Sequence, residues 1–256
     1  MESLHTPAVA LWQWTRGSGM RRNLRIGLAA GLTGGAAVLT ACSAGIDAGP
    51  ATSEERDVAG ATAVVLATAG DLIIRQGETT GLTVTAGENI LDQLSSDVRD
   101  GVLELGATGS RILGFGDVRY ELVLPEVHAV TVTGSGDVEA GVETGTALEL
   151  RSSGSGSISF HDVAVDDLTV EVTGSGTVRA DGRAGTQRAR ITGSGDYAGE
   201  DLTSDSATVE VAGSGSADVA VDGTLDARVS GSGDITYTGD AQVNSQVSGS
   251  GSVSRR

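Results

Sequence analysis

The chain has 256 residues, of which 39 are Gly, three are His and one is Cys. All 17 basic residues are Arg, against 34 acids, so the net charge is -17. This balance excludes a nucleic-acid binder as the first hypothesis, because phosphate contacts need a basic surface, and the few Cys and His exclude a disulfide scaffold or a Cys/His zinc site.

The first predicted element in chain order is a secretion signal over residues 1–41. Four arginines precede an uncharged run over residues 26–41, which is the order of charge and hydrophobicity in a signal peptide: Arg16, Arg21, Arg22 and Arg25. The run is shorter than the roughly 20 strongly apolar residues that a membrane-spanning helix needs. Met20 begins an equally good signal and is an alternative start of the protein.

The signal ends in Leu39-Thr40-Ala41-Cys42, which resembles a bacterial lipobox. The resemblance implies that Cys42 becomes the new N-terminus and is acylated, as with palmitate. A buried free thiol or an ordinary cleavage site is the alternative interpretation. We therefore expect a lipid-anchored protein on the extracytoplasmic face of the cell membrane, with residues 42–57 as a flexible tether that spans on the order of 20 Å.

Residues 58–126 follow with strand patterning and no repeat, and predict an N-terminal β-rich cap with the opening coils. Short apolar runs at residues 64–66, 72–74, 82–84 and 118–124 are candidate strands, and residues 89–94 are a candidate helical turn. Asp100-Gly101 lies between two alternating segments and predicts a β-hairpin. Residues 109–116 are expected to form an exposed loop.

Residues 127–256 are filled by a Gly-Ser-Gly repeat with a spacing of 18–20 residues. The copies are Gly134-Ser135-Gly136, Gly154-Ser155-Gly156, Gly174-Ser175-Gly176, Gly193-Ser194-Gly195, Gly213-Ser214-Gly215, Gly231-Ser232-Gly233 and Gly249-Ser250-Gly251. A fixed period of this length is typical of a solenoid, and it is too short for a βαβ unit. Apolar residues alternate on both sides of each motif, so we expect an all-β, single-chain parallel β-helix with one coil per repeat.

The glycines are interpreted as structural, because a corner between strands needs backbone angles that other residues avoid. The position two residues before each motif is β-branched and aliphatic in six of the seven copies, with Ser152 as the exception, and it is expected to point inward. The central Ser is small and is expected to donate a hydroxyl hydrogen bond along the stack.

A polar column three residues before each motif alternates in charge through five coils: Arg151, Glu171, Arg190, Glu210 and Arg228. Like charges directly opposed on neighbouring strands are unfavourable, so stacking in register would select this alternation. We therefore predict a charge ladder, with chance alternation as the other interpretation.

Three stretches resemble a known bacterial family, the putative auto-transporter adhesin, head GIN domain family: residues 69–77, 97–103 and 229–239. The resemblance extends over about residues 58–254. It implies a right-handed parallel β-helix exposed at the cell envelope, and right-handed crossovers are the general rule for parallel strands. It brings no catalytic residues with it.

Candidate chemistry is sparse. The acids that follow the motifs, Asp137, Asp196 and Asp234, lie two or three coils apart, which is too far to share a calcium ion, and Asp162, Asp166 and Asp167 form only a looser cluster. The Ser between glycines lacks the helix of a nucleophile elbow. His128 and His161 are the only histidines beyond the signal. We therefore expect no enzyme activity, metal or cofactor.

The functional hypothesis is an envelope-anchored β-helical lipoprotein with a structural or adhesive role. The alternatives are a ligand- or partner-binding sensor module of the envelope, with a loop site at residues 106–117, and a polysaccharide-acting enzyme, with a cleft of acids and Arg on one sheet face. Expected partners are the membrane through Cys42, an envelope or extracellular macromolecule, and a second copy through the uncapped end of the solenoid. No nucleic acid is expected.

Overall fold

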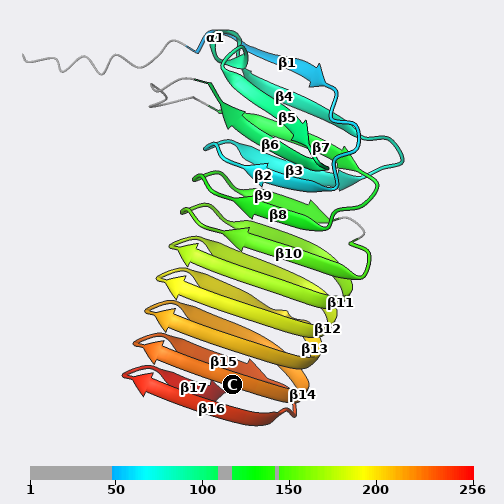
Figure 1. The fold of residues 1–256 in the computed structure, drawn as a ribbon. Helices are drawn as coiled ribbons and strands as arrows, with labels where there is room; N and C mark the ends of the chain where they lie inside the picture. Colours follow the sequence, from blue (N-terminus) through cyan, green and yellow to red (C-terminus); the bar gives the residue numbers. More distant parts are fainter. Residues whose placement is uncertain (1–47, 109–116, 142–143) are drawn as a thin grey trace, which may run out of the picture. The chain divides into compact units, whose positions relative to one another are not determined.

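The computed structural model describes residues 48–256 except 109–116 and 142–143, so Cys42, the signal, Met20 and the loop at 109–116 lie outside the described residues. Strands make up 70% of the structure and are joined into one 17-stranded sheet that winds upon itself (Figure 1). The one α-helix of this part is α1 (Glu88–Leu91), a single turn. The predicted all-β parallel β-helix is confirmed.

Each coil of the repeat region consists of two legs that form two opposite faces. One leg forms face A, made of β8 (Ala129–Val132), β10 (Ala147–Ser152), the C-terminal halves of β11 to β14, and β16 (Gln242–Gly249). The other forms face B, made of β9 (Val138–Gly141), the N-terminal halves of β11 to β14, β15 (Asp234–Thr238) and β17 (Ser252–Arg255). The four long strands are β11 (Ile158–Gly174), β12 (Thr177–Gly193), β13 (Asp196–Gly213) and β14 (Ser216–Gly231).

The strands of successive coils pair in parallel and in register. Following one position down face A, Asp167 pairs with Thr186, and Thr186 pairs with Ser206. Ser206 pairs with Thr224, and Thr224 with Gln242. These offsets confirm a coil of 18–20 residues.

The core is a narrow file of small aliphatic side chains between the two faces. At the position two residues before each motif, five of the aliphatic residues are at most 2% exposed: Val132, Val172, Ile191, Val211 and Val229. Ser152, the exception in this column, is also buried, and its hydroxyl donates to the carbonyl oxygen of Gly156 at 3.0 Å. Because its hydroxyl is hydrogen-bonded, Ser152 can be buried among aliphatic side chains at little cost, and the coil keeps the same inward-facing position.

Two tyrosines and one phenylalanine are the largest fully buried side chains of the core: Tyr120, Tyr197 and Phe160. The Tyr197 hydroxyl donates to Oε1 of Gln187 at 3.0 Å, and Nε2 of Gln187 donates to Oγ of Ser204 at 2.6 Å. Burial raises the pKa of Tyr197 far above its usual value, with a smaller contribution from Glu200 nearby. The side chain therefore remains neutral and hydrogen-bonded inside the solenoid.

The N-terminal region contributes two coils and a cap. The coil of β2 (Ala63–Leu66) and β3 (Asp71–Gln76) lies between the coil of β8 and β9 and a coil formed later in the chain by β6 (Val102–Ala107) and β7 (Arg119–Leu124). Face A therefore begins with β6 and β2, and face B with β7 and β3. Antiparallel strands then close this end: β4 (Gly81–Gly87) pairs with β7, and β5 (Leu94–Arg99) pairs with β6.

The hairpin predicted at Asp100-Gly101 joins β5 to β6, with φ of 51° and 81° at the two residues. Both residues occupy the left-handed region, as a two-residue hairpin turn with the right-handed twist of the strands requires. The predicted strands and helical turn of this region are also present, and together they confirm the β-rich cap.

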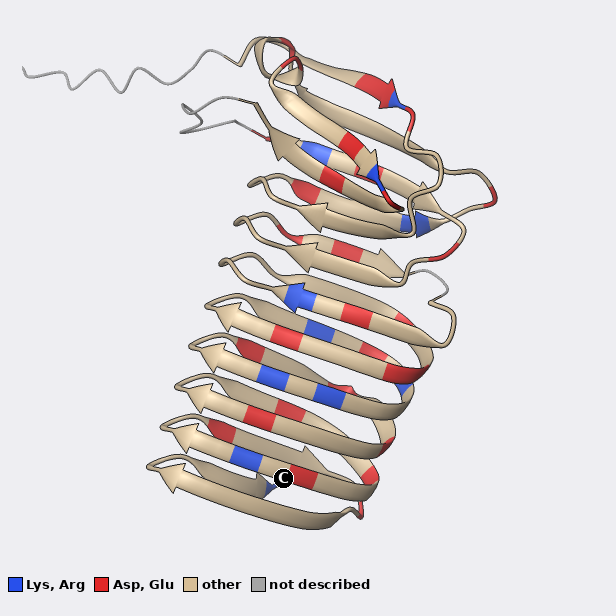
Figure 2. Cartoon of the chain, viewed as in Figure 1, with Lys and Arg blue, Asp and Glu red and all other residues tan. Residues whose placement is uncertain are grey.

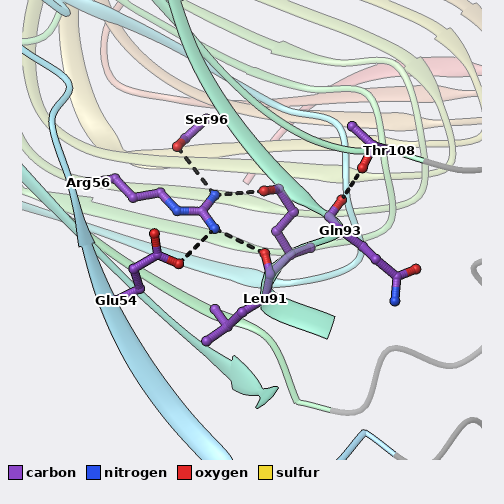
Figure 3. A network of polar contacts seen from close by, with 7 residues as sticks. Glu54, Arg56, Leu91, Gln93, Ser96 and Thr108 are labelled. Atoms are coloured by element: carbon purple, nitrogen blue, oxygen red, sulfur yellow. Dashed lines mark hydrogen bonds and ion pairs between the residues drawn. The ribbon is translucent and has the colours of Figure 1, made fainter. Parts of the chain in front are cut away.

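The flexible tether predicted for residues 42–57 is wrong for residues 51–56. They form β1 (Ala51–Arg56), which pairs antiparallel with β4 over its whole length. The Arg56 guanidinium fixes the strand, donating to the carbonyl oxygens of Leu94 at 2.8 Å and Leu91 at 3.1 Å (Figure 3). Because β1 is almost entirely exposed, its sequence carries no apolar alternation, and the composition alone resembles a linker.

The glycines of the repeat form the corner between face A and face B. From Gly174 onward the first glycine of each motif has a φ between 122° and 142°, which favours glycine. The second glycine is required by packing, since a Cβ on Gly215 would lie 2.0 Å from the carbonyl oxygen of Gly195 in the preceding coil. The backbone angles expected from the sequence therefore explain only the first glycine of each motif from Gly174 onward, and close stacking of the coils explains the others.

The central Ser contributes its backbone instead of the expected hydroxyl bond. The N–H of Ser194 donates to the carbonyl oxygen of Gly174 at 2.9 Å, and the N–H of Ser214 donates to that of Gly193 at 2.8 Å. The serine residues themselves are exposed. The corner is thus a smooth, uncharged edge.

Candidate functional site

The charge column lies on face A, where the register stacks its members directly. Arg151 pairs with Glu171, Glu171 with Arg190, and Arg190 with Glu210. Arg228 follows Glu210. Basic and acidic segments accordingly alternate down the front of the solenoid (Figure 2).

The side chains of this ladder bind one another. Nε of Arg151 lies 3.1 Å from Oε2 of Glu171, Arg190 forms an ion pair with Glu210, and Nη1 of Arg228 lies 3.6 Å from Oε1 of Glu210. Beside the ladder on the same face, Nη1 of Arg188 forms an ion pair with Oδ1 of Asp167 at 2.8 Å. All four of these face-A arginines are therefore engaged in pairs within the chain and are not free to recognise a ligand.

Face B differs in this respect. Of the 12 arginines in the described residues, nine form ion pairs: Arg56, Arg99, Arg151, Arg183, Arg188, Arg190, Arg228, Arg255 and Arg256. The three others, within this part of the chain, are Arg75, Arg119 and Arg179. All three are exposed, and all three lie on face B, on β3, β7 and β12.

These three arginines line two adjacent hollows on that face. One is a cavity of about 490 Å³ between β7 and β12, lined among others by Asp71, Arg119, Glu139 and Arg179. The other has a volume of about 610 Å³ and is lined among others by Arg75 and Glu121. Since β3 and β7 contribute to both, we call the two together the face-B groove.

Carboxylates and hydroxyls lie between the arginines of the face-B groove. Arg119 is the register partner of Asp71, and Ser159 pairs with Glu139 on one side and Arg179 on the other. Arg119 and Arg179 are four strand spacings apart, about 19 Å at the usual distance between strands. The groove thus presents both donors and acceptors over a length that suits an extended chain.

Two titratable side chains that line the groove already have hydrogen-bond partners within the chain. Nδ1 of His161 lies 2.7 Å from Oδ2 of Asp181 in the next coil, and Oδ1 of Asp137 accepts from the N–H of Ser157 at 2.8 Å. These contacts hold neighbouring coils together. Among the described residues, the charged groups of the groove without a hydrogen-bond or ion-pair partner are its three arginines and Glu55, Asp71, Glu121 and Glu139.

The other candidate residues predicted from the sequence do not lie together in one site. Asp196 and Asp234 each accept from a Ser hydroxyl of the next coil at 2.6 Å, and Asp167 binds Arg188. Nε2 of His128 lies 3.4 Å from Glu126 at the surface. Within the described ranges, no three His, Cys, Asp or Glu side chains are placed to hold a metal ion.

The proposed loop site at residues 106–117 falls largely on residues outside the description, which omits 109–116. Among the residues that are described, no helix is long and apolar enough to cross a membrane. The face-B groove was not predicted from the sequence, where its three arginines lie outside the alternating column but do not differ from ion-paired arginines such as Arg99 and Arg183.

A family model for the putative auto-transporter adhesin, head GIN domain, matches residues 62–241. A comparison with curated proteins finds no match. Among solved structures, a putative adhesin from Bacteroides fragilis matches with a TM-score of 0.76 at 21% identity, covering 81% of this chain and 97% of that one.

Two structures from Parabacteroides distasonis are also similar, each covering 81% of this chain. One is a putative adhesin with a TM-score of 0.65 at 23% identity, matched over 98% of its length. The other is described as a putative lipid binding protein, with a TM-score of 0.66 at 22% identity, matched over 97% of its length. At these identities the likeness shows a shared fold.

Proposed function

This chain belongs to the putative auto-transporter adhesin, head GIN domain family, and from that premise we propose that it is a surface adhesin whose face-B groove binds an extended, hydroxyl-rich polymer such as a cell-surface polysaccharide. Family membership fits a structural or adhesive role and a surface-exposed location. The observation that carries the proposal is that the three described arginines without an ion pair all line one groove.

The chemistry of the groove suits hydroxyl groups. A sugar hydroxyl both donates and accepts hydrogen bonds. A guanidinium offers five donors and a carboxylate offers several acceptor positions, so a groove that holds both can satisfy the hydroxyl in each role. Since Asp71, Glu121 and Glu139 lie beside the arginines, a strongly anionic polymer would be repelled, and a neutral or weakly acidic one is favoured.

Each hydrogen-bonded contact of this kind is weak, and strong attachment requires many contacts at once. None of the described residues that line the groove is Trp or Tyr, the residues that give interfaces their strongest contacts, and many copies on one surface would supply avidity. The interior of the described coils is filled by side chains such as Tyr120 and Phe160, which favours binding on the surface of the solenoid.

A lipid anchor at Cys42 would hold the groove outside the membrane, and we include it in the proposal. Replacing Cys42 with Ser is expected to move the protein from the membrane fraction to the soluble fraction. One acyl chain binds a bilayer only marginally, so stable anchoring would need more than one. Unchanged retention of the variant in the membrane would contradict the anchor and leave the groove untouched.

The groove is tested by binding to immobilised bacterial polysaccharides of neutral, weakly acidic and sulfated types. The triple variant Arg75→Ala, Arg119→Ala and Arg179→Ala is expected to lose affinity about tenfold or more, since each hydrogen bond contributes about 0.5–1.5 kcal/mol. The control removes three exposed but ion-paired arginines, Arg99, Arg183 and Arg188, so the change in net charge is equal.

Equal affinity of the two triple variants would refute the groove as the binding site. The same assay separates the enzyme alternative, because a polysaccharide-acting enzyme would produce new chain ends in the bound polymer. Binding without new chain ends is the result that the adhesive role predicts.

A further inference from the structure

The coil formed by β16 and β17 ends the stack of described strands with two open edges. Within the described residues, β16 pairs only with β14 and β17 only with β15. Each strand thus presents a row of backbone N–H and C=O groups on its outer side, and such a row is a template for another strand.

The edge of β16 carries none of the features that normally block pairing. It is eight residues long, Gln242–Gly249, and contains neither a charged residue nor Pro. Gln246 continues the column of the charge ladder with a neutral side chain below Arg228. In a protein with a net charge of -17, this neutral strand is a place where a second acidic molecule can approach without repulsion.

The core is also open at this coil. Val247 is 43% exposed, while Val229, the residue above it in the same column, is 2% exposed. Val243 and Val253 are partly buried against the core. A partner that continued both faces would cover these valines, and apolar burial would add to the pairing of the strands.

The opposite end of the stack does not offer a matching surface. Its edge strands in the described residues are β1, with Glu54 and Glu55, and β5, with Asp97 and Arg99. Charges of this kind protect an edge against pairing. Head-to-tail stacking would place them against the neutral β16, whereas two copies joined at β16 bring identical neutral strands together. The one charged residue of β17, Arg255, is already ion-paired within its own copy.

We propose that two copies of this chain associate through a two-fold axis at this end, with β16 of each copy antiparallel to β16 of the other and the valine-lined core ends in contact. A two-fold interface uses the same surface on both subunits and closes at the dimer. The inference is independent of the face-B groove, which lies toward the other end of the stack.

The test uses the absence of Lys from this chain, which makes an introduced Lys the reporter for a short amine cross-linker. Asn244→Lys places the reporter on β16, where Asp226 of the preceding coil can pair with it. Thr208→Lys is the control, in the middle of face A between Arg188 and Asp226. We expect a cross-linked dimer of the full chain for Asn244→Lys and none for Thr208→Lys.

Light scattering gives the mass of the unmodified chain, which we expect to be that of a dimer at micromolar concentrations. Val247→Glu puts two like charges at the centre of the interface and is expected to give a folded monomer, with folding checked by circular dichroism. A monomer at every concentration of the unmodified chain, a series of larger assemblies, or equal cross-linking of the two Lys variants would overturn the proposal. The cross-linking result stands if Val247→Glu fails to fold.

Discussion

Replacing Glu171 with Arg tests whether the charge ladder contributes to the stability of the stack. Glu171 lies between Arg151 and Arg190 in the register, and its carboxylate forms an ion pair with Arg151 at 3.1 Å. The substitution removes this pair and sets three arginines one above another at the usual strand spacing of about 4.8 Å.

The magnitude follows from the exposure of the residues. The side chains of Arg151 and Glu171 are 47% and 42% exposed, so solvent screens the interaction, and each contact lies at the low end of about 0.2–1 kcal/mol. One attraction lost and two repulsions gained should lower the free energy of unfolding by about 1 kcal/mol at low salt. The loss should shrink as salt rises, because exposed charges are screened within about 10 Å at 0.1 M.

Urea denaturation at two ionic strengths measures the effect, with Thr169→Arg as the matched control. Thr169 lies on the same strand and face but pairs with Glu149 on one side and Arg188 on the other, so an Arg there gains one attraction and one repulsion. We expect a near-neutral midpoint for the control and a salt-dependent decrease for Glu171→Arg. Equal midpoints with no salt dependence would refute the electrostatic reasoning.

Three further substitutions probe the corner, the cap and the core. Gly215→Ala should destabilise the protein by about 2 kcal/mol or more in thermal denaturation, because its Cβ would lie 2.0 Å from a carbonyl oxygen. Gly141→Ala is the control and should have little effect, since the nearest atom to its Cβ would be 3.8 Å away. Arg56→Met should lower the free energy of unfolding by about 1–3 kcal/mol, because two backbone carbonyls lose their donor. The Arg99 side chain is 69% exposed, so Arg99→Met should be nearly neutral by the same measurement. Tyr197 has a raised pKa, so the folded state retains a proton that the unfolded chain loses above about pH 10, and stability should fall with rising pH by about 1.4 kcal/mol per unit there. Tyr197→Phe should weaken that slope in alkaline unfolding curves, and an unchanged slope would assign it to other groups.

The repeat region was predictable from the sequence because each coil repeats the same physical requirement. A residue such as Val172 must point inward in every coil, so its column is visible without a structure. The register followed from the same periodicity, since equal spacing fixes which side chains are neighbours. Even the broken position at Ser152 is explained locally, by one hydrogen bond to Gly156.

The N-terminal end was predictable only in part, because its contacts join segments distant in the chain. The strand β1 is polar on both sides and is held by pairing with β4 and by the Arg56 guanidinium, neither of which leaves a local pattern. The order of coils is also non-sequential, since β2 and β3 lie between later strands. Sequence spacing carries no information about such an insertion.

The face-B groove was missed for a related reason. The alternating column of face A is conspicuous in the sequence, whereas Arg75, Arg119 and Arg179 occupy three different positions in their coils. Only the strand order β7, β3, β9, β11 and β12 along face B brings them onto one surface. A residue without an ion pair is also a property of the folded surface and has no signature in the sequence.

Arginine-specific chemical labelling, read by mass spectrometry with and without bound polysaccharide, tests the central claim most directly. The account predicts that the polysaccharide protects Arg75, Arg119 and Arg179 from the reagent and leaves the ladder residues Arg190 and Arg228 unchanged. Protection of the ladder arginines, or equal protection at all five positions, would contradict the assignment of face B as the adhesive surface.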